Sequence, residues 1–119
     1  METINFQLFN LIRTNNLKLG SSDSRDGAQW VVSPPQLVTP LNAGECQGTI
    51  TANQGAKLYF EYKIEGSRNP VDFLYVNCRL VNGEPRIDAG TGTTDYKVSS
   101  NYINAGPNRW IVNIDFRKA

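Results

Sequence analysis

The stretch Gly55–Leu80, GAKLYFEYKIEGSRNPVDFLYVNCRL, decides the fold. Its first half alternates, with Leu58, Phe60, Tyr62 and Ile64 on one parity, which predicts a strand with one buried face. The following Gly, Ser, Asn and Pro residues predict a turn. The second half alternates again, but both of its faces are largely apolar or aromatic. Because a hairpin alone cannot bury two faces, we expect the rest of the chain to supply a covering layer.

The remaining sequence reads as further short strands separated by Gly, Asn and Pro turns. Strands are expected at Thr3–Ile12, at Leu17–Leu19 with an end at Gly20–Ser22, at Trp30–Val32, Gln36–Thr39, Glu45–Ala52 and Asp95–Ser99, and at Arg109–Phe116. Turns are expected at Asp26–Gly27 and Asn82–Gly83, a short return at Arg86–Ile87, and loops at Asp88–Thr94 and Asn101–Asn108.

No stretch shows a helical period. Eight to ten short strands therefore predict an all-β fold, an antiparallel β-sandwich of two packed sheets, with a closed barrel as the alternative. The 119 residues form one domain, which is large enough for a core without covalent staples.

Composition excludes several functional classes. Twelve basic and eleven acidic residues are scattered, so no basic stripe of a nucleic-acid-binding protein is visible. No apolar run is long enough to span a bilayer. The first residues carry no secretory signal, and we expect cytoplasmic synthesis followed by release, or a mature chain whose signal has been removed.

The chain has no histidine and only two cysteines, Cys46 and Cys78. Metal sites of the usual Cys/His type are therefore excluded, and the commonest general base is missing, so we expect no metal, no cofactor and no catalytic residue. The two thiols can pair only if their strands lie side by side, which the sequence leaves open. Their simplest interpretation is two reduced, buried residues.

Two patterns resemble functional sites, a phosphate-binding loop and a glycosidase acid pair, but are better interpreted as an ordinary loop and as surface acids. The Gly/Thr segment Asp88–Thr94 lacks the lysine and the following helix of a phosphate-binding loop. Acids such as Glu61, Glu65 and Asp72 include no pair that the sequence singles out as a glycosidase pair, and we interpret them as surface acids.

The aromatic residues exceed what the inward faces need. Trp30 and Trp110 lie among inward residues and are predicted to belong to the core. Tyr59, Phe73 and Tyr75 lie on the opposite parity, and they either fill a second buried face or form an aromatic surface. Tyrosines combine an apolar ring with a polar tip, which suits a membrane interface or a sugar-binding shelf. The same two interpretations apply to Tyr96 and Tyr102.

The second half of the chain resembles the aegerolysin family. Leu74–Arg79 resembles the aromatic-rich family segment that ends in Trp-Asp-Cys-Pro-Trp, and Thr94–Ser99 resembles the following strand, Asn-Thr-Trp-Thr-Val-Ser. Arg109–Val112 is similar to the closing Lys-Trp-Met-Ile. The small aegerolysin-like component of bacterial two-component insecticidal toxins is also similar, through Asp26–Trp30 and Leu58–Ile64. Together these short motifs cover most of the chain.

This resemblance implies a β-sandwich that recognises a membrane lipid, often a sphingolipid, and a larger partner protein that forms the pore. It implies a non-enzymatic component of a cytolytic or insecticidal pair that acts at the target-cell membrane, and a second copy of the chain is a further candidate partner. The alternative function is a carbohydrate-binding β-sandwich in which Tyr59, Phe73 or Tyr75 is the sugar platform.

The chain departs from the family where the family has tryptophans. Val76 and Leu80 replace the two that flank Asp-Cys-Pro, Arg79 replaces the proline, and Tyr96 replaces the tryptophan of the next strand. An arginine at position 79 can pair with a phosphate group. The predicted lipid contacts are therefore Tyr75, Arg79, Tyr96 and Tyr102, with Tyr59 and Phe73 as a neighbouring aromatic surface.

Overall fold

A computed structural model describes residues 1–119 as ten strands without a helix. The strands are β1 (Glu2–Asn10), β2 (Leu17–Arg25), β3 (Ala28–Val32), β4 (Leu37–Val38), β5 (Ala43–Ile50), β6 (Lys57–Ile64), β7 (Phe73–Val81), β8 (Glu84–Thr91), β9 (Tyr96–Gly106) and β10 (Arg109–Lys118). No helix is present that is long and apolar enough to cross a membrane.

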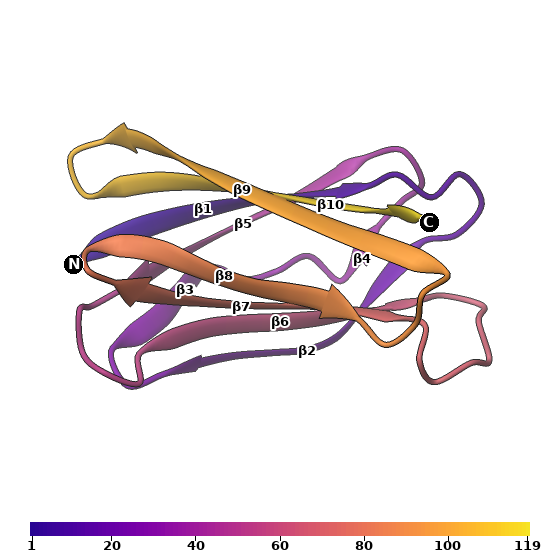
Figure 1. The fold of residues 1–119 in the computed structure, drawn as a ribbon, viewed down its shortest axis with the longest axis horizontal. Helices are drawn as coiled ribbons and strands as arrows, with labels where there is room; N and C mark the ends of the chain where they lie inside the picture. The colour runs from indigo at the N-terminus through magenta and orange to yellow at the C-terminus, as the bar shows by residue number, and fades with distance from the viewer.

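The strands form two five-stranded sheets, which confirms the predicted sandwich. Sheet A has the order β3-β5-β1-β10-β9, and sheet B has the order β4-β2-β6-β7-β8. Figure 1 shows the two layers packed against each other, with the chain termini at opposite ends. All neighbouring strands are antiparallel except β1 and β10, which pair in parallel inside sheet A. The first and last strands of the chain thus lie side by side in one sheet.

The core lies between the sheets and contains the side chains that point inward from alternate positions of each central strand. On β6 and β7 the buried residues are those that the alternation selects, and Trp110, Val112, Ile114 and Phe116 of β10 are buried as predicted. Four rings form the centre: Phe6 lies 5.5 Å from Phe60 and 5.7 Å from Trp30, and Tyr62 lies 5.8 Å from Phe60, between ring centroids. Trp110 is therefore a core residue as predicted, whereas Trp30 is partly buried and packs against the core.

The predicted turns form with suitable backbone geometry. At the β7–β8 hairpin, Asn82 and Gly83 have φ angles of 53° and 79°, and Val81 pairs with Glu84. Two successive positive φ values belong to the two-residue turn whose twist matches that of the strands. Asp26 and Gly27 turn the chain from β2 in sheet B to β3 in sheet A.

Cys46 and Cys78 are both free and buried.

Three strand boundaries predicted from the sequence were wrong. Strand β2 does not end at Gly20–Ser22 but continues to Arg25 after a register shift beyond Leu19. Strand β8 extends to Thr91 through part of the predicted Gly/Thr loop, and β9 runs from Tyr96 to Gly106 through most of the predicted polar loop. Strands β8 and β9 are sheet edges with mostly exposed or half-buried residues, so neither requires the apolar alternation that marks a central strand.

Candidate functional site

The solvent-facing side of sheet B gathers four of the six predicted site residues, and we call it the sheet B face. Tyr59 lies on β6, whereas Phe73, Tyr75 and Arg79 lie on β7. Glu61 pairs with Tyr75, and Lys63 pairs with Phe73, so these side chains share one side of the sheet. The strand alternation turns them away from the core, while Phe60, Val76 and the residues that alternate with them turn inward.

Two aromatic rings on this face lie over Gly90 of β8 and Gly92 just after that strand. A β-carbon on Gly90 would lie within 2.8 Å of the Tyr75 hydroxyl oxygen, and one on Gly92 would lie 2.5 Å from a carbon of the Phe73 ring. Both rings therefore occupy the space above these glycines, and their centroids are 6.4 Å apart. Gly90, which was predicted as part of a loop, lies in β8, Gly92 lies in the loop that follows, and both make room for half-buried rings.

The same face carries three cross-strand pairs of cations. Lys18 pairs with Lys63 at one end, and at the other end Arg25 pairs with Lys57 and Arg79 pairs with Arg86. Lys57 precedes Leu58 and Arg79 follows Cys78, so the pairing of Leu58 with Cys78 sets Lys57 beside Arg79. The last two pairs thus form one line across four strands, which we call the cationic row: Arg25, Lys57, Arg79 and Arg86. Like charges directly opposite each other destabilise an antiparallel pair.

Nearby acids neutralise only part of the cationic row. Arg25 forms an ion pair with Asp23, and Arg79 lies 3.9 Å from Asp88. Lys57 and Arg86 have no ion-pair partner. The Arg25 side chain is 62% exposed and that of Arg79 is 44% exposed, so both guanidinium groups are open to a ligand. The cationic row thus offers uncompensated positive charge at the surface.

A hollow of about 450 Å³ opens beside the row, between β2 and β6. Ser21, Ser22, Asp23, Arg25, Lys57 and Tyr59 line it. Hydroxyl groups, two cations, one carboxylate and one ring thus surround the same space. The Lys57 ammonium lies 5.8 Å from the centroid of the Tyr59 ring, within the range of a cation–π contact.

Local contacts set the electrostatics of this hollow. The hydrogen bond from Arg25 lowers the pKa of Asp23, which therefore stays ionised. Burial, together with the hydrogen bond that its hydroxyl donates to Glu61, raises the pKa of Tyr59 to about 12. Tyr59 thus remains a neutral ring with its hydroxyl already engaged. On β7 the buried carboxamide oxygen of Asn77 has no hydrogen-bond partner.

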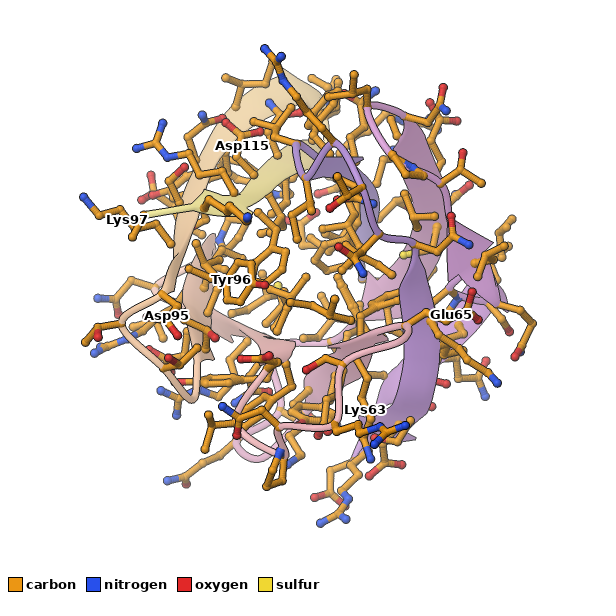
Figure 2. All side chains as sticks on the ribbon, turned by 90° about the vertical axis from the view of Figure 1, so that its right-hand side faces the viewer. Lys63, Glu65, Asp95, Tyr96, Lys97 and Asp115 are labelled. Atoms are coloured by element: carbon orange, nitrogen blue, oxygen red, sulfur yellow. The ribbon has the colours of Figure 1, made fainter.

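The other two predicted lipid contacts both lie on β9, the edge strand of sheet A. Figure 2 shows Tyr96 pointing between the two sheets, whereas neighbouring Lys97 points outward. The Tyr96 ring stacks on Phe116 with centroids 5.3 Å apart, and burial raises its pKa. Tyr102 packs edge-on against Trp110 at 5.6 Å. Its hydroxyl donates to Glu84, which raises its pKa. The structure therefore does not bring Tyr96 and Tyr102 to the sheet B face.

The acids do not converge. Glu61 accepts the hydroxyl of Tyr59, and the exposed Glu65 accepts a hydrogen bond from Asn16. No group of three or more His, Cys, Asp or Glu side chains is arranged to hold a metal ion.

Sequence reasoning missed Arg25, Lys57 and Arg86 as members of the candidate site. Each is an ordinary surface cation in the sequence, and their apposition depends on strand register. Register could have been estimated only after the partners of β2 and β8 were known.

No protein-family model matches this chain. No curated protein matches it in sequence either.

Proposed function

We propose that the protein is a non-enzymatic binding component that recognises a phosphate-bearing membrane lipid through the sheet B face. The cationic row beside Tyr59, Tyr75 and Phe73 carries this inference. Cations attract the phosphate of a headgroup, and half-buried rings suit the boundary between headgroups and acyl chains. The opposed charges weaken the bare sheet, so an anionic group between them relieves a repulsion that folding alone leaves in place.

The hollow between β2 and β6 is the place for the headgroup. Lys57 and Arg25 would bind its phosphate, and the serine hydroxyls would donate further hydrogen bonds. Sphingolipids are included among the candidate ligands because the sequence resembles the aegerolysins. The same resemblance supports release to a target-cell membrane and recruitment of a larger pore-forming partner, as in two-component cytolytic or insecticidal toxins.

Co-sedimentation with lipid vesicles tests lipid recognition. The panel contains vesicles with ceramide phosphoethanolamine, sphingomyelin or anionic glycerophospholipids, each in a phosphatidylcholine background. We expect the double variant Arg79→Gln/Arg86→Gln to bind anionic vesicles about 30-fold more weakly, because each basic residue near such a surface contributes about 1 kcal/mol. Added salt should weaken wild-type binding to the same vesicles.

Sheet A supplies a control with the same change of charge. Arg117 of β10 pairs with Lys97 of β9, so Arg117→Gln/Lys97→Gln also removes an opposed cation pair. This control should retain vesicle binding. If it loses as much binding as the first variant, or if the wild type binds no vesicle in the panel, the sheet B face is not a lipid site.

Dye-filled vesicles test the division of labour between this chain and a partner. Bound wild-type protein should leave the dye inside until a pore-forming partner is added. Release of the dye by this protein alone would overturn the assignment of the pore to the partner.

A further inference from the structure

The solvent-facing side of sheet A contains a second hollow, of about 340 Å³, which none of the predicted site residues lines. This volume lies within the range of small-molecule sites. The hollow lies over the middle of the sheet and is lined in part by the strands β5, β1 and β10. It is separated from the sheet B face by the whole core, so it is a different site.

Strand register brings three side-chain amides together in this hollow. Gln47 of β5 pairs with Asn5 of β1, and Gln7 lies two residues further along β1. All three are half-buried, and none makes a side-chain hydrogen bond within the protein. Each carboxamide therefore presents both a donor NH₂ and an acceptor oxygen to the hollow.

Apolar and charged groups complete the lining. Ile111 pairs with Asn5, and Val32 pairs with Gln47, so an aliphatic side chain flanks the amides on each side. Arg109 lies level with Thr3, whereas Glu45 lies level with Gln7. These two levels are four residues apart along β1, about 13 Å at the usual rise of a strand. The charges therefore stand at opposite ends and form no ion pair with each other.

We propose that this hollow is a binding site for a neutral carbohydrate of one to two sugar units. A sugar hydroxyl both donates and accepts, so it matches a carboxamide, while the C–H side of a sugar ring suits Ile111 and Val32. An extended peptide would instead bind at a sheet edge through main-chain hydrogen bonds. Here the main-chain groups of β1 are already used on both sides by β5 and β10, so only side chains are available.

Glycan binding is measured on the soluble protein without vesicles. The protein is screened on an array of neutral oligosaccharides, and the strongest hit is titrated as a free oligosaccharide by NMR. The side-chain NH₂ signals of Asn5, Gln7 and Gln47 should shift on addition of the sugar. Asn5→Leu should weaken binding about tenfold, the effect of one lost hydrogen bond. Gln47→Met, which keeps the side-chain length, should do the same and serves if the first variant folds poorly.

Thr49→Val is the matched control, because Thr49 lies on the same side of β5 outside the hollow. It should bind the sugar within twofold of wild type. The site is refuted if the array yields no hit, if the shifts centre on Tyr59 and Tyr75, or if the control loses as much affinity as Asn5→Leu. The Arg79→Gln/Arg86→Gln variant should bind the sugar normally, which separates this result from the lipid test.

Discussion

The solvent-facing side of sheet B carries aromatic rings and three opposed cation pairs, whereas the hollow on the central strands of sheet A gathers three amides and two aliphatic side chains. Both sheets have five strands and share one core. Sheet B opposes like charges across its strands three times, at positions where neutral residues would be more stable. Sheet A places unpaired amides in a hollow. The inward residues of both sheets serve packing, and we propose that the two outer sides bind different ligands.

The largest expected effect separates packing from ligand chemistry on a single strand. Phe60 is 2% exposed and contacts Phe6 and Tyr62, while adjacent Tyr59 lies on the sheet B face. Phe60→Ala should lower the free energy of unfolding by about 3–5 kcal/mol, because it leaves a cavity in the core. Tyr59→Ala should cost only about 1 kcal/mol. Urea unfolding measures both, and equal losses would show that the outer ring is a core residue.

A pair of glycines sharpens the comparison between the two sheets. In sheet A, a β-carbon on Gly48 would lie 2.5 Å from a methyl carbon of Leu58 inside the core. In sheet B, a β-carbon on Gly90 would meet the Tyr75 ring, which can swing toward solvent. Gly48→Ala should therefore lower the free energy of unfolding by about 1–3 kcal/mol through overpacking. Gly90→Ala should cost less in thermal unfolding and displace the Tyr75 ring. The opposite order of stabilities would contradict this placement.

Alkaline pH probes the inward face of each sheet. Burial raises the pKa of Cys46 and of Cys78 from 9.0 to about 12. Above pH 9 the unfolded chain loses these protons while the folded chain keeps them, so stability should fall as pH rises toward 12. Between pH 9 and 10 we expect a loss of about 1 kcal/mol for each thiol. Urea midpoints measured across this range should fall less steeply for Cys46→Ala/Cys78→Ala.

The smallest expected effect distinguishes the two thiols by their surroundings. Both thiols face inward, but Cys46 is 6% exposed, whereas Cys78 of sheet B is 0% exposed. Both should react slowly with a thiol reagent at neutral pH, because thiols with raised pKa values are largely protonated. Mass spectrometry of the partly labelled protein should find Cys46 modified first. Earlier labelling of Cys78 would show that sheet B opens more readily than sheet A.

The central strands could be predicted from the sequence, but much of the candidate site could not. The inward residues of β6, β7 and β10 follow a period of two because their burial requires it. The sequence predicts Tyr75 and Arg79 as site residues, and both lie on the sheet B face. The sequence did not distinguish Tyr96 and Tyr102 from Tyr75, because a tyrosine that packs against the neighbouring strand at a sheet edge and one on the outer face have the same local pattern.

The all-β class, the alternation of the core strands and the two-residue turns follow from the sequence alone, because they depend on neighbours along the chain. Asn82 and Gly83 adopt positive φ where their residue types favour it, and Phe60 faces inward because its strand alternates. Only the tertiary structure placed Arg25 opposite Lys57 and Gln47 opposite Asn5. Register and strand order join residues far apart in the chain, and long-range pairing is set by the packing of the whole core.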